Sequence, residues 1–322
     1  MTIATKLTPL LGVEHPVMLA PMGFVSGGTL AAAVSAAGGF GIIGGGYADS
    51  DWLEREVSAA GNHPIGVGFI TWALAERPAS LDLALNHQPA AIMLSFGDAA
   101  PFLPKIKRAG VLSICQVQSV AQARSVLREG ADIIVAQGTE AGGHGSGRST
   151  LPLVPAVVDA VASSDRTNVP VVAAGGITDG RGLAAALMLG ADGVLMGTRF
   201  YVASESLASP GAKGRVVAMS GDDTLRTAVF DIARGYDWPK EYTGRALRNR
   251  FSEAWHGHEA ALKQDEAGHA GYTEAAMRGD PDIAVVFAGE GIDLIHAVEP
   301  AGVILDRLIW EADAALAQRF TT

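Results

Sequence analysis

The residue best suited to chemistry in this chain is His144, which closes the glycine-rich segment 136–145. The run Ile133–Val135 before this segment is β-branched and predicts a buried strand. Imidazole changes charge near neutral pH, so a histidine on a tight loop at the carboxyl end of a strand can accept a proton from a carbon or oxygen acid. A simple turn with a solvated histidine is the alternative interpretation, because glycine-rich loops are common.

Further candidates for ligand binding also follow apolar runs. Gly175–Gly176 and Gly197–Thr198 each come after such a run, and we expect each pair to begin a helix whose free N–H groups hold an anion. Plain turn chemistry is the competing interpretation. The amide of Gln116 can hydrogen-bond a flavin edge or a carbonyl substrate. We find no carboxylate pair and no His/Cys/Asp cluster with metal-ligand spacing, so a phosphate-bearing cofactor such as FMN fits best.

The elements that position these residues repeat as strand, loop and helix. Each strand is apolar almost throughout, as expected of parallel strands covered on both faces. About eight units fill the first two thirds of the chain, which predicts an α/β fold of the TIM (β/α)8 type. An open doubly wound sheet is the competitor, but the first loop, Ala20–Gly23, lacks the glycine pattern that such a sheet uses. The predicted strands are Val17–Ala20, Phe40–Ile43, Ile65–Phe69, Ala91–Ser95, Val111–Cys115, Ile133–Val135, Val169–Ala174 and Gly193–Met196.

The repeat stops near Tyr201, which divides the chain into parts. We expect residues 1–200 to form the barrel and residues 201–299 to form a mainly helical cap beside its mouth. A last helix at about 300–320 is expected to pack back on the barrel, because it carries an apolar stripe. Within the cap, the turn residues of Asp231–Pro239 predict an extended loop.

Composition limits the classes of partner. The formal net charge is −10, so nucleic acid is a poor candidate and a small molecule a better one. The single Cys115 cannot form an internal disulfide, which fits a reducing compartment. We find no apolar run long enough for a membrane span and no signal-peptide core, and we therefore expect a cytoplasmic protein. Whether the chain forms a homodimer is left open.

Four elements follow strands in the chain: Ala20-Pro21-Met22, Ala136–His144, Ala174–Ile177 and Met196–Phe200. In this order and spacing they resemble the nitronate monooxygenase family, formerly called 2-nitropropane dioxygenases. The resemblance spans Val17 to Phe200, and its most specific part is Glu140–His144. It implies a TIM barrel that binds FMN without a covalent bond and oxidises nitronates or nitroalkanes with O2 to a carbonyl compound and nitrite.

The resemblance also implies roles for individual residues. His144 would be the base that deprotonates a nitroalkane or steadies a nitronate, and no metal is implied. Residues that follow five of the predicted strands would bind the cofactor, and the last four of them would hold its phosphate: Ala20, Pro21, Met22, Gln116, Ala141, Gly142, Gly143, Gly175, Gly176, Gly197 and Thr198. Gln116 stands where relatives often carry Lys, Gly68 where several carry Asn, and Glu290 replaces a common Gln. These three departures bear on the substrate more than on the cofactor.

Two other functions remain open at this level. The first keeps FMN but uses NAD(P)H to reduce a quinone or an enoyl thioester on the same barrel. The second is a non-catalytic sensor that binds a phosphate ligand on a barrel. Rapid bleaching of the flavin by NADH without oxygen would indicate the reductase, and a colourless protein that cannot be reconstituted with FMN would indicate the sensor.

Overall fold

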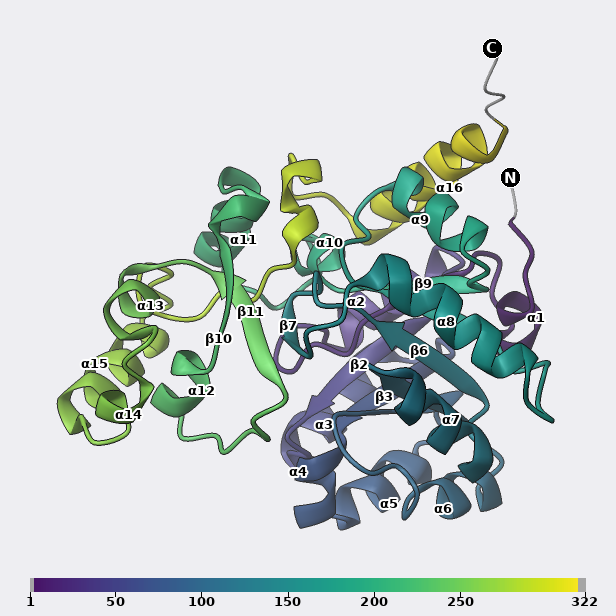
Figure 1. The fold of residues 1–322 in the computed structure, drawn as a ribbon, viewed down its shortest axis with the longest axis horizontal. Coiled ribbons are helices and arrows are strands. Elements are labelled where there is room, and N and C mark those ends of the chain that lie inside the picture. The colour runs from purple at the N-terminus through teal and green to yellow at the C-terminus, as the bar shows by residue number, and fades with distance from the viewer. Residues whose placement is uncertain (1–2, 318–322) are drawn as a thin grey trace.

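Eight apolar segments form the parallel strands of a barrel in the computed structural model, which describes residues 3–317 (Figure 1). The strand order is β1-β9-β8-β6-β5-β4-β3-β2, and a bridge between Met18 and Phe40 joins the two ends. The structure therefore confirms the predicted (β/α)8 barrel. The strands are β1 (Val17–Leu19), β2 (Gly41–Gly46), β3 (Ile65–Ile70), β4 (Ala91–Ser95), β5 (Leu112–Val117), β6 (Ile133–Gln137), β8 (Val171–Ala174) and β9 (Gly193–Met196).

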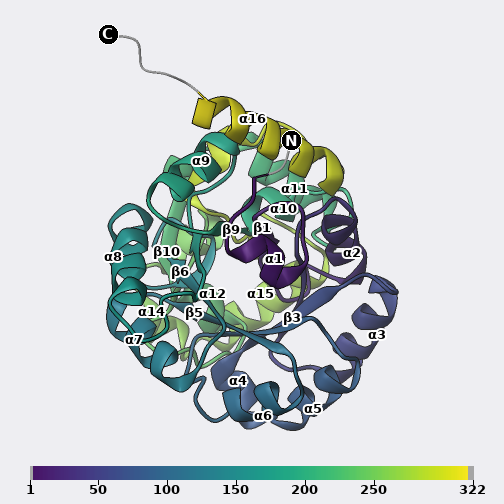
Figure 2. The ribbon, with the colours of Figure 1, turned by 90° about the vertical axis from the view of Figure 1, so that its right-hand side faces the viewer.

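Helices surround the strands in a ring, with α1 (Leu7–Leu11) near its centre (Figure 2). Leu7 and Leu11 of α1 join the side chains that fill the barrel, including Met18, Met93 and Leu195, so α1 packs against the interior. The other helices of the barrel are α2 (Gly28–Ala36), α3 (Ser50–Ala60), α4 (Thr71–Glu76), α5 (Ala79–Asn86), α6 (Leu103–Arg108), α7 (Val120–Glu129), α8 (Thr150–Ala162), α9 (Gly180–Met188), α10 (Thr198–Tyr201) and α16 (Ala301–Ala317).

The last helix, α16, lies in this ring between α9 and α2 (Figure 2). Its buried stripe includes Ile304, Leu308 and Ala312, the spacing that the sequence predicts. Gly180 at the start of α9 lies so close to α16 that an added Cβ would come within 2.5 Å of the Leu308 carbonyl oxygen. The crossing of α9 and α16 therefore depends on a residue without a side chain.

A cap follows the last barrel strand and stands to one side of the barrel (Figure 1). Its strands β10 (Thr224–Thr227) and β11 (Thr243–Leu247) are antiparallel, and β11 pairs in turn with β7 (Gly143–Gly145) of the loop after β6. The cap therefore contains a small sheet as well as helices, and this sheet takes in His144. The cap helices are α11 (Pro210–Ala218), α12 (Val229–Ala233), α13 (Arg250–Trp255), α14 (Glu259–Leu262) and α15 (Glu266–Met277).

The extended loop predicted over residues 231–239 is wrong at its start, because Asp231 lies in α12. Val229, Phe230 and Ala233 are buried in the apolar cluster of the cap, and their packing stabilises a helical turn that the flanking glycine and proline obscure in the sequence. Within residues 3–317, no helix is long and apolar enough to cross a membrane.

Candidate active site

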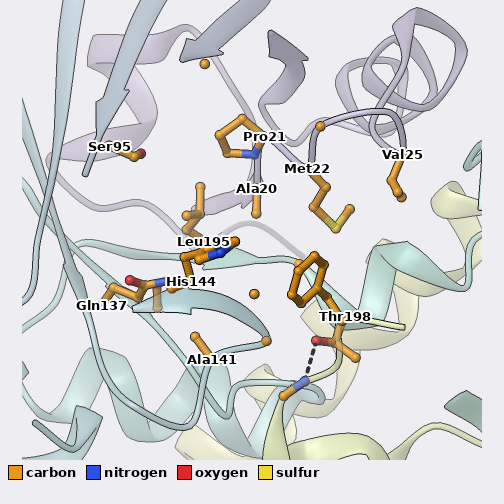
Figure 3. Close-up of a pocket in the computed structure, with 18 of the residues that line it drawn as sticks. Ala20, Pro21, Met22, Val25, Ser95, Gln137, Ala141, His144, Leu195 and Thr198 are labelled. Carbon is orange, nitrogen blue, oxygen red and sulfur yellow. Dashed lines mark hydrogen bonds between the residues drawn. The ribbon is translucent and has the colours of Figure 1, made fainter. Parts of the chain in front are cut away.

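One cavity lies where the carboxyl ends of the barrel strands meet the cap, and every site residue selected from the sequence lines it. Its volume is about 1290 Å³, including the part open to solvent. Figure 3 shows Pro21, Ala20 and Met22 on one side and His144 with Gln137 facing them. The predicted residues that line the cavity are Ala20, Pro21, Met22, Gln116, Ala141, Gly142, Gly143, His144, Gly175, Gly176, Gly197 and Thr198.

His144 is buried in this wall, so the alternative of a solvated histidine in a simple turn is wrong. It belongs to β7, where its backbone pairs with Gly244 of β11, and its side chain is only 8% exposed. The imidazole stacks flat on Trp238, with ring centroids 3.4 Å apart and an interplanar angle of 3°. Phe96 and Phe287 lie at centroid distances of 6.3 and 5.4 Å. Strand pairing and aromatic packing together fix the orientation of the ring.

Asp231 of the cap helix α12 is the hydrogen-bond partner of His144. Its Oδ2 lies 2.8 Å from Nε2 of the imidazole, and its side chain is only 4% exposed. A carboxylate at Nε2 favours the tautomer with the proton on Nε2, which leaves a lone pair on Nδ1. Nδ1 contacts no hydrogen-bonding group of the described residues and is not sealed from solvent. The free nitrogen is therefore the one that a ligand can reach.

Burial lowers the pKa of His144 below its usual value of 6.5, and this effect exceeds the opposing effects of the Asp231 hydrogen bond and charge. The positive charges of Arg234 and Arg226 lower the pKa further. At neutral pH the ring is thus uncharged and able to accept a proton.

A chain of amides sets the direction of Gln116. Gln137 Nε2 donates to the His144 carbonyl oxygen, so Gln137 must turn its Oε1 toward the neighbouring amides. The Nε2 groups of Gln116 and Gln118 both donate to Gln137 Oε1, at 3.1 and 3.0 Å. Gln116 lines the cavity, and with its Nε2 donating to Gln137 its own oxygen is left as an acceptor, whereas the Lys that the resemblance places here in many relatives would be a donor.

Two cap arginines fasten the loop that leads to His144. Arg226 of β10 donates to the carbonyl oxygens of Thr139, Gly145 and Thr243, and Arg245 of β11 also donates to the Thr139 carbonyl oxygen. Burial lowers the pKa of Arg226 to about 10, so the guanidinium stays charged at neutral pH. These bonds satisfy backbone groups of the loop and connect its position to the cap sheet.

The other side of the cavity carries backbone N–H groups without protein acceptors. Gly176 adopts φ +72°, which favours glycine, and among the described residues neither its N–H nor that of Gly197 donates to an acceptor. The expectation that Gly175–Gly176 begins a helix is wrong, because Asp179 caps α9 three residues later by accepting from Gly182 N. The loop itself thus presents the N–H groups.

Only Gly197–Thr198 stands at a helix start, that of the short α10. Thr198 Oγ1 accepts from Gly289 N at 3.0 Å, the dashed line in Figure 3, and thereby joins α10 to the residue that caps the 3-10 helix Glu290–Leu294. Bare N–H groups on one side, and aromatic and amide walls on the other, fit a planar ring with an anionic tail, as the predicted flavin has.

Of the three departures from the family pattern, two lie at the cavity and one does not. Gly68 lines the cavity beside Pro21, and a Cβ at this position would come within 2.5 Å of the Pro21 Cγ. Gln116 lines it as described. Glu290 instead pairs with Arg245 at 2.8 Å, with its side chain 44% exposed, and does not reach the cavity wall.

The sequence does not single out Asp231, Arg234, Phe96 or Phe287 for this site. Phe96 directly follows β4, so its place at a strand end was a signal for the barrel mouth. The other three come from segments that only the folded cap brings to His144, although the helical spacing of Val229, Phe230 and Ala233 is a signal for α12. No group of three or more His, Cys, Asp or Glu side chains within residues 3–317 is arranged to hold a metal ion.

The family model described as nitronate monooxygenase matches residues 4–79 and 73–311. A nitronate monooxygenase of Neurospora crassa is 35% identical, and the match covers 93% of this chain and 89% of that protein. FabK of Thermotoga maritima has a TM-score of 0.84 with 32% identity over 98% of both chains. A nitroalkane oxidase of Streptomyces ansochromogenes has a TM-score of 0.78 with 29% identity, covering 97% of this chain and 99% of its own. These matches include the cap as well as the barrel.

Proposed function

Because the chain belongs to the nitronate monooxygenase family and is a flavin-dependent oxidoreductase, we propose that it binds FMN and oxidises nitronates or nitroalkanes with O2 to a carbonyl compound and nitrite. The observation that carries this proposal is His144, a buried, uncharged base at the barrel mouth with one nitrogen held by Asp231 and the other open. A flavin bound in the cavity would supply the acceptor for the electrons of the substrate and the route to O2.

The residues of the chain perform the proton chemistry. Nδ1 of His144 takes the proton from the carbon beside the nitro group of a neutral nitroalkane. The electron pair of that C–H bond forms the C=N bond of the nitronate, and the negative charge moves onto its oxygens. Asp231 stabilises the imidazolium that results, because its carboxylate already bonds Nε2. Trp238 and Phe287 hold the ring and exclude water from the reacting carbon.

The candidate cofactor residues form two groups, one for each end of the flavin nucleotide. The N–H groups of Gly176 and Gly197 support binding of one phosphate, which is the reason for proposing FMN. Ala20, Pro21, Met22 and Gln116 would line the ring, with the Gln116 oxygen available to an N–H of its edge. Release of the bound flavin by denaturation, followed by mass determination, identifies it, and FAD would contradict this assignment.

The substitution His144→Asn tests the proposed base. We expect kcat/KM for nitroethane to fall about 10²- to 10⁴-fold, the usual value of a general base, while turnover of ethyl nitronate falls much less because that substrate is already deprotonated. Nitrite release from both substrates and from propionate 3-nitronate is the measurement. Full activity on nitroethane in the variant would falsify the role of His144.

The similarity to FabK leaves a second chemistry open, an NAD(P)H-dependent reduction of a quinone or an enoyl thioester on the same barrel. Anaerobic mixing with NADH separates the two functions. A reductase would bleach its flavin within the time of a turnover, whereas the oxygenase would be reduced hardly at all.

A further inference from the structure

We infer that Arg234 is the residue that binds the anionic, two-oxygen group of the substrate and so determines its position against His144. The inference rests on the proposed function and assigns a specificity residue to the same site. It stands on the positions of Arg234 and His144, which both line the cavity, and of the buried Asp231, which lies next to both of them outside the lining.

Arg234 is the only Lys, Arg, Asp or Glu among the described residues that line this cavity. Its Nη1 is buried, and the distance from Nη1 to Asp231 Oδ1 is 3.7 Å, which is too long for a hydrogen bond. Its Nε and Nη2 donate to no acceptor in residues 3–317 and, unlike Nη1, are not sealed from solvent. Buried cations of proteins normally have a hydrogen-bonded partner, so these donors lack an acceptor that a ligand can supply.

Aromatic rings hold the guanidinium in place. Its Cζ lies 4.6 Å from the centroid of Tyr236, 6.0 Å from Tyr47 and 5.9 Å from Phe287. Tyr47 and Tyr236 are themselves stacked at 3.9 Å, and Tyr47 accepts from Trp238 Nε1. Phe287 also packs on His144, so the cation and the base border the same ring. The donors are therefore preorganised, and little side-chain entropy is lost on binding.

The charges of Arg234, Asp231 and His144 fit a substrate that becomes an anion when it loses its proton. Before proton transfer the positive Arg234 balances the negative Asp231, and His144 is neutral. After transfer the imidazolium is next to Asp231, and the new nitronate needs a cation of its own. A planar guanidinium matches two coplanar oxygens with two parallel hydrogen bonds, whether they belong to a nitronate or to a carboxylate.

Nitrate is the probe for this assignment, because it is planar, anionic and unreactive. We expect it to perturb the flavin spectrum of the holoenzyme and to compete with ethyl nitronate. In Arg234→Gln the Kd for nitrate and the KM for ethyl nitronate should rise at least tenfold, with a smaller change in the KM for neutral nitroethane. Acetate is titrated in parallel. A lower Kd for acetate than for nitrate would indicate that Arg234 prefers a carboxylate to a nitronate. Arg278→Gln is the matched control, since that arginine is exposed at the end of α15.

Flavin content and its Kd should stay unchanged in Arg234→Gln, and a matching loss of flavin would show that the residue serves the cofactor instead. If Arg234→Gln does not fold, Arg234→Lys is the second variant. Lysine keeps the positive charge but lacks the planar guanidinium. We therefore expect this variant to bind nitrate measurably but more weakly than the wild type does. Nitrate affinity equal to wild type in either folded variant overturns the assignment. A wild-type protein that binds nitrate through Arg234 but releases no nitrite would overturn the proposed function alone.

Discussion

At the scale of single residues, the site depends on the balance between burial and one carboxylate. Burial removes the charged form of His144, and Asp231 opposes this effect only in part. As the proposed base, a histidine with a lowered pKa is ready to accept a proton at pH 7 but holds that proton less strongly after the transfer. Asp231 offsets that weakness, because its hydrogen bond is strongest when the ring is positive.

The lowered pKa of His144 gives the pH profile a definite direction. Protonated imidazole cannot accept a proton, so kcat/KM for nitroethane should be constant near neutral pH and fall tenfold per pH unit below the pKa, which lies under 6.5. A profile measured from pH 4.5 to 8, on protein shown to stay folded, gives the midpoint. A midpoint well above 6.5 would contradict the buried, neutral ring.

Replacing Asp231 by Asn tests the partner of the base. The carboxylate raises the pKa of His144, so its loss should move the acidic limb of the nitroethane profile to lower pH. We also expect kcat for nitroethane to fall by about 10²-fold or more, because an amide can select the wrong tautomer. Ethyl nitronate, which needs no deprotonation, is the internal control. Equal losses with both substrates would point to a structural role for Asp231.

At the scale of elements, β7 is where the barrel and the cap meet. The segment contains only Gly143, His144 and Gly145, yet it pairs with β11 and its Gly145 carbonyl oxygen accepts from Arg226. Arg245 donates to the Thr139 carbonyl oxygen in the loop before it. Positive φ at Gly143, +74°, lets the chain turn into this pairing. The position of His144 therefore depends on β11, which lies about 100 residues later in the chain.

Substituting Arg226 by Met should loosen this connection. The change leaves the Gly145 and Thr243 carbonyl oxygens without their guanidinium donor, at a cost of about 1–3 kcal/mol in the free energy of unfolding. Urea denaturation measures this loss, and nitroethane turnover should fall with it because the loop carries His144. Arg124→Met, on the exposed face of α7, is the control and should change stability by less than about 0.5 kcal/mol.

The elements also show which features the sequence could predict. Parallel barrel strands are continuous apolar runs, so all eight were predictable to within three residues at each end, and the selection of His144 and the strand-end glycines followed from their places. β10, β11 and α12 are short, with only four or five residues each. β11 pairs with β7, a distant segment that consists of one histidine between two glycines. Asp231 and Arg234 therefore look like ordinary surface charges in the sequence, and only the cap packing reveals their contacts with the site.

At the scale of the whole molecule, the barrel is completed from both ends of the chain. α1 packs into its interior, and α16 fills the ring beside α9 after the chain has passed through the entire cap. Gly180 N donates to Glu311 of α16, so the helix after β8 is joined to the last helix. The loop that presents Gly176 thus depends on residues far along the chain.

Truncating the core of this contact should destabilise the entire barrel. Leu308→Ala removes a side chain that is 2% exposed in α16, and we expect a loss of about 2–5 kcal/mol in the free energy of unfolding. Trp310→Ala on the solvent face of the same helix, where the side chain is 65% exposed, should cost less than about 0.5 kcal/mol. Thermal unfolding of the holoenzyme compares the two, and equal losses would contradict the packing described.

The pairing of β7 with β11 has a consequence for recombination between homologues. A chimaera that joins the barrel of this chain to the cap of a relative would separate His144 from Asp231 and separate its loop from Arg226 and Arg245. Residues 139–145 and 224–245 should accordingly be exchanged as one cassette, even though about 80 residues of other sequence lie between them.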